Sequence, residues 1–219
     1  MNIDEFFPIE SVRLEIYQLL AGCYSIPDRT TLTKKASLIA ALKKSKIQFE
    51  FESKLTTFET SPEDLLVDYS RLFVGPYKLL APPYGSIYLD GQRQLFGDST
   101  VDVQSRYESA GLQFSKDFRE APDHIAAELE FLYFLIFLEV EALEKENWEA
   151  VLESLKFQES FLNDHLGAWI SRFASDVEEN AQTEFYKNLA IITSKFVQGD
   201  LTNIKNSSIP QFGKFINNN

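Results

Sequence analysis

The stretch FLYFLIFL, residues 131–138, is the longest uninterrupted apolar run in the chain. It is far shorter than the roughly 18 residues that a membrane span needs. Apolar side chains on all sides of a helix predict burial at the centre of a protein. A start at APDH (121–124) and an end near Lys145 would make this helix the longest of the chain. We therefore expect the fold to be built around it.

The rest of the chain also favours helices, because apolar residues recur at three- and four-residue spacing while Gly and Pro are few. Ser61-Pro62 is typical of a helix start, with a hydroxyl cap and a proline in the first turn. Residues 98–100 offer a second cap, and Pro27 ends the first helix. We expect further helices at about 12–23, 31–44, 47–58, 62–74, 101–110 and 147–165, one around Trp169, and one at 185–199.

The predicted fold class is all-α. We expect a single compact bundle of about eight or nine helices over residues 1–199, with a long functional loop, followed by a polar tail over 200–219 that should fray. Residues 47–58 alternate in part as a strand would, and a helix is the preferred interpretation. Trp148 and Trp169 are expected in the core.

The charge of the chain limits its partners. With 33 acidic and 21 basic residues, the formal charge is -12. This argues against a nucleic-acid partner and suits a cationic peptide, although acidity also serves solubility alone. A single cysteine, Cys23, excludes an internal disulfide and a thiolate metal cluster. The first ten residues lack the basic start and apolar run of an export signal, so we expect a cytoplasmic protein.

Residues 76–97, PYKLLAPPYGSIYLDGQRQLFG, form a long connection between two expected helices. Irregular connections of this length are usually functional or disordered, and the aromatic and aliphatic content argues against disorder. The preceding helix carries Tyr69, Leu72 and Phe73 at helical spacing, a pattern found more often in a core than in a site. Combined with the loop tyrosines, however, this face has the composition of a peptide-binding groove.

One polar cluster, formed by Asp123, His124 and Glu128, lies at the start of the central helix. Three interpretations are open: a helix cap with an i, i+4 pair, an acid–base or divalent-metal site of a hydrolase, and a polar anchor for a peptide. The only histidines are His124 and His165, and neither follows a Glu at three residues. Metalloprotease, phosphate-loop and hydrolase-elbow motifs do not occur. Enzymatic interpretations are therefore weak, and no metal or other cofactor is expected.

Three segments carry a family resemblance. Residues 68–76 read DYSRLFVGP, residues 81–90 read APPYGSIYLD and residues 122–131 read PDHIAAELEF. Together they resemble the TorD/DmsD family of redox-enzyme maturation chaperones, most of all its DmsD-like type, through the elements Y-x-x-L-F-x-G-P, A-P-P-x-x-S-[VI]-[YW] and P-D-H-[IL]-x-x-E-L. A weaker similarity runs from residue 161 to Tyr186. The family is cytoplasmic and all-helical, and it serves molybdenum enzymes of the dimethyl sulfoxide reductase superfamily.

The resemblance implies a chaperone, not an enzyme. Such a chaperone binds the twin-arginine leader of a molybdoenzyme and delays export until cofactor insertion and folding are complete. Its partners would be the leader and the apo form of the catalytic subunit, with the twin-arginine export machinery as a further candidate and no nucleic acid or membrane span. A monomer and a domain-exchanged homodimer both remain open.

The resemblance also implies a set of peptide-binding residues. They are Tyr69, Leu72, Phe73, Asp123 and His124, together with Pro83, Tyr84, Gly85, Ser86 and Tyr88 of the loop and Glu128 of the helix. Where some relatives have Trp in these elements, this chain has Tyr69, Tyr84 and Tyr88, and the departure leaves the identity of the partner open.

The chemistry of a leader suits these residues. A twin-arginine leader has a cationic start and an apolar stretch, so its receptor needs acceptors and an apolar trough. Asp123, Glu128 and the net charge would provide the acceptors, and Leu72, Phe73 and the loop tyrosines would provide the trough. We expect Asp123, at a helix start that favours negative charge, to accept hydrogen bonds from arginine. The alternatives are a metal-dependent hydrolase at the polar cluster and a non-catalytic helical adaptor.

Overall fold

The computed structural model describes residues 3–45, 60–75, 79–91, 96–113 and 120–217, and every regular element in them is a helix. The α-helices are α1 (Ile3–Cys23), α2 (Thr31–Lys44), α4 (Pro62–Tyr69), α5 (Gly85–Leu89), α6 (Asp98–Ser109), α7 (Ile125–Glu144), α8 (Trp148–Asp164), α9 (Leu166–Asn180), α10 (Glu184–Asn203) and α11 (Ile209–Asn217). Two π-helical turns continue them, η1 (Ser70–Val74) after α4 and η2 (Ile204–Ser208) between α10 and α11. The predicted all-α fold is confirmed.

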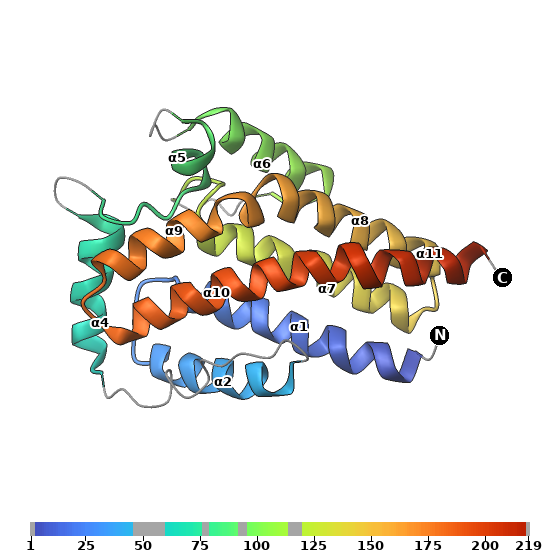
Figure 1. Ribbon diagram of the computed structural model, residues 1–219, viewed down its shortest axis with the longest axis horizontal. Helices are drawn as coiled ribbons and strands as arrows, with labels where there is room; N and C mark the ends of the chain where they lie inside the picture. Colours follow the sequence, from blue (N-terminus) through green and yellow to red (C-terminus); the bar gives the residue numbers. More distant parts are fainter. Residues whose placement is uncertain (1–2, 46–59, 76–78, 92–95, 114–119, 218–219) are drawn as a thin grey trace.

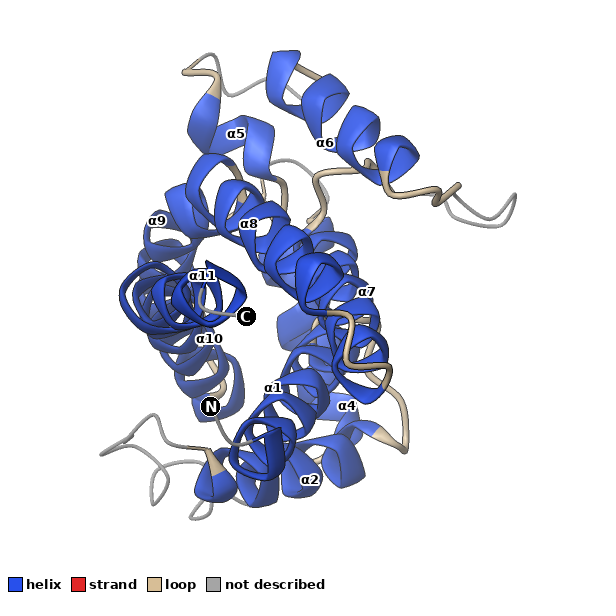
Figure 2. Ribbon diagram, turned by 90° about the vertical axis from the view of Figure 1, so that its right-hand side faces the viewer, coloured by secondary structure: helices blue, strands red, loops and turns tan. Residues whose placement is uncertain are grey.

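The long helices run along the length of the molecule (Figure 1) and surround a common axis when it is viewed from one end (Figure 2). Helix α1 packs on α7, α7 on α8, α8 on α9 and α9 on α10, and α10 returns to α1. Helix α2 covers α1 from outside, and α4 lies across one end. Helix α5 packs on α9, and α6 packs on α5. This arrangement leaves the first turns of α7 between α1 and α6.

Local sequence accounts for several helix starts. Ser61 and Asp64 form a capping box, because the Ser61 hydroxyl accepts from the Asp64 backbone N–H while the Asp64 carboxylate accepts from the Ser61 backbone N–H. Pro62 occupies the first position of α4, where a missing N–H costs nothing. Asn147 begins α8 as expected, with its side-chain oxygen accepting from the backbone N–H of Ala150. These starts were predictable because each depends on neighbours in the chain.

The core is rich in aromatic side chains. Fully buried rings are contributed by Tyr17, Tyr24, Phe161, Trp169, Phe173, Tyr186, Phe196 and Phe212. Many of these rings meet edge to face, as Phe131 and Phe161 do with ring centroids 4.8 Å apart, a geometry that adds to the gain from burial alone. Trp169 is in the core as expected, whereas Trp148 is only partly buried. Cys23 is a buried free thiol, and burial raises its pKa to about 12.

A buried ionic network joins four helices through Arg13 of α1. Its guanidinium donates to Asp200 of α10 over 2.7 Å and to Glu10 over 2.8 Å, and it also contacts Glu139 of α7 at 3.3 Å and Gln158 of α8. Burial raises the pKa of Glu10 and raises that of Glu139 to about 8. One guanidinium therefore faces three carboxyl groups, and protonation of a glutamate reduces the excess of buried negative charge.

The central helix differs from its expected form in two respects. Helix α7 has 20 residues and is shorter than α1, which has 21. Its apolar run is not buried on all sides, because Phe137 and Leu138 are 41% and 38% exposed. Helices α1 and α8 pack against α7, and the packing leaves part of its surface open.

The long connection and the next helix also differ from expectation. The short helix α5 lies within the connection, so residues 76–97 are not irregular throughout. Helix α6 begins at Asp98 with Gly97 as its N-cap and without a side-chain cap, so the caps expected from residues 98–100 are wrong. The helix expected at 47–58 lies outside the described residues and stays a prediction.

The C-terminal segment is folded, and the expected fraying is wrong for residues 200–217. Helix α10 continues through η2 into α11. Phe212 is fully buried, with its ring 4.8 Å from that of Phe6 and 6.4 Å from that of Trp148. The polar composition of the segment favoured a tail, although Ile209 and Phe212 stand at the three-residue spacing of a helix face. No helix in the described ranges combines the length and hydropathy needed to cross a bilayer.

Candidate functional site

The loop over residues 81–89 is fastened to the start of α7 by backbone hydrogen bonds. Gly85 N–H donates to the carbonyl of Asp123 over 2.9 Å, and Ile125 N–H donates to the carbonyl of Pro83 over 2.8 Å. These bonds form an antiparallel bridge between Tyr84 and His124. Two of the three motif segments are thus parts of one structure, which we call the loop clamp (residues 81–89 and 121–128).

Asp123 completes the clamp with its side chain. The carboxylate is fully buried, and Oδ2 accepts a 2.7 Å hydrogen bond from the backbone N–H of Ser86. Its other oxygen, Oδ1, and the Ser86 hydroxyl have no hydrogen-bond partner among the described residues. The expected acceptor for a partner's arginine is therefore inside the protein and already bonded to the loop.

His124 is the N-cap of α7. Its Nδ1 accepts from the backbone N–H of Ala126 over 3.2 Å, so a neutral ring carries its proton on Nε2. Burial lowers the pKa of His124 to about 4, although the charges of Glu120 and Asp123 act in the opposite direction. The imidazole is therefore neutral at neutral pH. The cap in the first interpretation is confirmed, whereas Glu128, the expected partner at i+4, bonds to Trp169.

Glu128 joins the start of α7 to α9. Its Oε2 accepts from the indole N–H of Trp169 over 3.0 Å, and its Oε1 has no partner within the described part of the chain. Burial raises the pKa of Glu128 well above its ordinary range, against the effect of the Trp169 hydrogen bond. Tyr88 stacks on the same indole, with ring centroids 5.5 Å apart. Glu128 therefore acts on the loop through Trp169, because it fixes the indole on which Tyr88 stacks.

Gly85 is required by this packing. A Cβ atom built at residue 85 would lie 3.0 Å from Glu128 Oε1 and 3.0 Å from Trp169 Nε1. Such contacts are tighter than ordinary van der Waals distances, so a larger residue would make the Glu128 and Trp169 side chains shift.

The helix face expected to form an apolar trough, on α4 and η1, lies in the core. Tyr69, Leu72 and Phe73 are 7%, 0% and 5% exposed. The Phe73 ring packs against Phe173 and Tyr186, with centroids 6.0 and 5.5 Å apart. The three residues do not form an open surface with the loop tyrosines, and their part in binding a peptide stays a prediction.

Glu120 is a member of this region that the sequence interpretation missed. Its carboxylate accepts a 2.6 Å hydrogen bond from the Tyr84 hydroxyl. Its charge also adds to the effect of burial on Tyr69, whose pKa is raised to about 12. An exposed acidic residue in an acidic chain carries no distinctive pattern. Its only sequence signal is its position two residues before Pro122.

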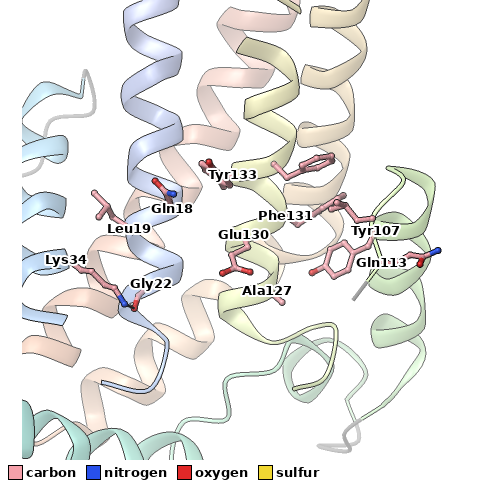
Figure 3. Close-up of a pocket in the computed structure, with 12 residues that line it drawn as sticks. Gln18, Leu19, Gly22, Lys34, Tyr107, Gln113, Ala127, Glu130, Phe131 and Tyr133 are labelled. Carbon is pink, nitrogen blue, oxygen red and sulfur yellow. Dashed lines mark hydrogen bonds between the residues drawn. The ribbon is translucent and has the colours of Figure 1, made fainter. Parts of the chain in front are cut away.

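A cavity of about 670 Å³ opens beside the clamp (Figure 3). Helix α7 forms its floor, with α1 and α2 on one side and α6 with the following loop on the other. The lining residues are Gln18, Leu19, Gly22, Lys34, Tyr107, Leu112, Gln113, Ala127, Glu130, Phe131, Tyr133 and Phe134. The lining combines aromatic and aliphatic side chains with a few polar groups, a composition typical of ligand sites.

The apolar floor of the cavity continues along α7. Ala127, Phe131 and Phe134 line the cavity, and Leu138 is four residues beyond Phe134 on the same helical face. The neighbouring Phe137 is exposed as well. The span from residue 127 to residue 138 is about 16 Å at 1.5 Å per residue, so the surface is long enough for about three helical turns of a partner.

The hydrolase alternative has no geometric support. In the described ranges, no group of three or more His, Cys, Asp and Glu side chains is placed to hold a metal ion. Asp123 bonds to Ser86, His124 to Ala126 and Glu128 to Trp169, so each member of the cluster has a different partner.

Comparisons with known proteins agree with this picture. The model of the family described as nitrate reductase delta subunit matches residues 33–175. The chain is 34% identical over 147 residues to the chaperone protein TorD of Photobacterium profundum, covering 67% of this chain and 66% of that protein. It is 34% identical over 133 residues to the Tat proofreading chaperone DmsD of Salmonella typhimurium, covering 60% and 58%. The aligned parts thus span less than two thirds of both relatives.

One solved structure has a similar fold. It is a putative redox enzyme maturation protein from Archaeoglobus fulgidus, matched with a TM-score of 0.53 and 24% identity over 85% of this chain and 93% of that one. The likeness supports the helical arrangement described above.

Proposed function

The chain belongs to the nitrate reductase delta subunit family, which includes the TorD chaperones, and from this premise we propose that it is a chaperone in molybdoenzyme maturation. It binds the twin-arginine leader of a dimethyl sulfoxide reductase-type catalytic subunit in the cytoplasm. By holding the leader, it delays export until the cofactor is inserted and the subunit is folded. The relatives' names, TorD and Tat proofreading chaperone DmsD, support this proposal.

The observation that carries the proposal is the cavity on α7. A leader has an apolar stretch, and the cavity with its continuation to Phe137 and Leu138 offers an apolar surface of matching length. Exposed apolar surface of this kind is costly unless a partner covers it. The formal charge of -12 favours the approach of a cationic segment.

The loop clamp has a supporting part in this mechanism. Asp123 bonds to the loop through Ser86, and the His124 ring contacts that of Tyr84. Glu128 bonds to Trp169, on which Tyr88 of the loop stacks, and the same turn of α7 leads into the cavity at Ala127. A rigid helix start reduces the entropy that binding would otherwise cost. We therefore assign Pro83, Gly85, Ser86 and Tyr88, with the three helix residues, to positioning the site. Tyr69, Leu72 and Phe73 support it from the core.

The protein performs no covalent chemistry in this proposal. It binds the leader and the apo form of the catalytic subunit, without a cofactor of its own. The experiment that tests it is calorimetric titration with a synthetic peptide that carries two adjacent arginines followed by an apolar segment. We expect binding, and we expect Phe134→Glu to weaken it at least about tenfold, because a charge would then face an apolar ligand.

The control for this variant is Val67→Glu. Val67 is 64% exposed on α4, away from the cavity, so this substitution adds the same charge without touching α7. Unchanged affinity of Phe134→Glu, with circular dichroism showing a folded protein, would move the leader away from the cavity. Failure of the unmodified protein to bind any such leader would reject the function itself.

A further inference from the structure

Three side chains from two segments meet near the start of α7: Tyr84 comes from the loop, and Glu120 and His124 come from the residues that precede the helix. The Tyr84 hydroxyl donates to Oε2 of Glu120 over 2.6 Å, and the Tyr84 ring lies edge to face with His124 at a centroid distance of 5.3 Å. Glu120 is exposed, Tyr84 is partly buried and His124 is almost fully buried. The result is an exposed carboxylate bonded to a partly buried tyrosine, whose ring in turn contacts a buried histidine.

The Glu120 carboxylate retains acceptor capacity in this arrangement. A carboxylate has about four lone-pair sites on two oxygens, and Tyr84 bonds to Oε2. Tyr84 also holds the carboxylate in one place, so a ligand would not have to order it. The neutral His124 ring adds no positive charge that would oppose a cation.

This chemistry is selective for a planar cation. A guanidinium group forms paired hydrogen bonds to a carboxylate and stacks on aromatic faces, which an ammonium group does less well. The first turn of α7 carries partial positive charge that disfavours cations. The Asp123 carboxylate at the same turn and Glu120 beside it oppose that effect.

The position of the cluster also sets a direction. His124 lies one turn before Ala127 on the same face of α7, and Ala127 lines the cavity. A ligand with its cationic part at Glu120 would therefore place the following residues over the cavity, toward Phe134 and Leu138.

We propose that Glu120, Tyr84 and His124 form a subsite for an arginine of the leader, whose apolar segment then runs along α7 from Ala127 toward Leu138. This proposal rests on the proposed function and adds to it which end of the site receives the cationic part. Glu120 is the residue that distinguishes a charged leader from an uncharged one.

The test is a cycle of two peptides and three proteins, measured by calorimetric titration. One peptide carries two adjacent arginines before an apolar segment, and the other has citrulline in place of both arginines. The unmodified protein should bind the arginine peptide about tenfold more tightly, the value of a hydrogen bond to a charged group. In Glu120→Gln the ratio should fall to about one, while affinity for the citrulline peptide stays unchanged. Glu153→Gln, an exposed glutamate on α8, is the matched control and should keep the tenfold ratio.

The outcomes separate the two proposals. If the unmodified protein binds both peptides equally, or if Glu120→Gln keeps the full ratio, the subsite is wrong while the leader-binding function stands. If Glu153→Gln loses the ratio as well, the preference is a general charge effect and the subsite is again wrong. If neither peptide binds, the proposed function fails and the subsite fails with it.

Discussion

The backbone N–H of Ser86 donates to Oδ2 of Asp123 over 2.7 Å, across 37 residues of sequence. This bond joins the proline-rich loop to the first residues of the central helix. The two segments look like separate motifs in the sequence, and both are expected there to bind a peptide. In the structure, this bond and two backbone hydrogen bonds hold the loop on the start of the helix.

Replacing Asp123 should therefore reduce stability. Asp123→Ala leaves the Ser86 N–H without its acceptor in a buried position, and we expect a loss of about 1–3 kcal/mol in the free energy of unfolding. Asp123→Asn retains a side-chain oxygen and should cost less. Urea unfolding monitored by circular dichroism measures both. Equal stability of Asp123→Ala and the unmodified protein would contradict the clamp.

Two glycine substitutions should have opposite effects. Gly85→Ala brings a methyl group to 3.0 Å from Glu128 and Trp169, and we expect a loss of about 1–3 kcal/mol from this overpacking. Gly213→Ala, in α11, meets no atom within 4 Å and should stabilise by about 0.5–1 kcal/mol through helix propensity. Thermal unfolding of the two variants side by side tests the prediction, and a shift in the same direction for both would refute it.

Local signals in the sequence were sufficient for most of the secondary structure. The start of α4 at Pro62 and the cap at Asn147 depend on residues a few positions apart, and α2 has the predicted bounds. The exposure of Phe137 was not predictable, because a helix with apolar side chains all round gives no indication of which side its neighbours leave open. The bond between Ser86 and Asp123 was not predictable either, since nothing local pairs them.

Removal of the buried guanidinium should be strongly destabilising. Arg13→Met leaves Asp200 and Glu10 without their cation, and we expect a loss of about 3–5 kcal/mol. Adding Asp200→Asn to this variant should recover part of the loss, because one uncompensated charge is then removed. Chemical unfolding of the single and double variants provides the measurement. A double variant that is less stable than Arg13→Met would show that the network is not held by charge balance.

Glu139 should make stability depend on pH. Its pKa of about 8 in the folded protein lies above the ordinary value of 4.5, so the folded state keeps a proton that the unfolded chain loses. Its contribution to the free energy of unfolding is full below about pH 4.5 and is lost as the pH rises toward 8. In Glu139→Gln, the free energy of unfolding should therefore decline less between about pH 4.5 and 8. Urea unfolding at several pH values measures this difference.

The control for the pH experiment is again Glu153→Gln, which should leave the dependence of the free energy of unfolding on pH unchanged. His124 acts in the opposite direction, because its lowered pKa removes stability as the pH falls from about 6.5 to 4. A Glu139→Gln profile as steep as that of the unmodified protein above pH 5 would contradict the assignment to Glu139.

The start of the central helix was predictable, whereas the cavity beside it was not. Asp123 and His124 were correctly placed at the start of a helix, whereas the contact between Tyr84 and His124 is visible only in the structure. The open surface, however, is formed by residues such as Leu19 and Phe134, which come from different helices and follow ordinary amphipathic patterns. Only packing shows that these patterns leave a cavity.

Cys23 has a practical consequence for mapping the bound leader. It is the one cysteine of the chain, and its buried thiol ionises only at high pH, so it will be unreactive toward maleimides while the protein stays folded. A cysteine introduced at Leu138 would then be the single labelling position. A photo-crosslinker or fluorophore attached there can report which leader residue passes over that point, without removal of the native thiol.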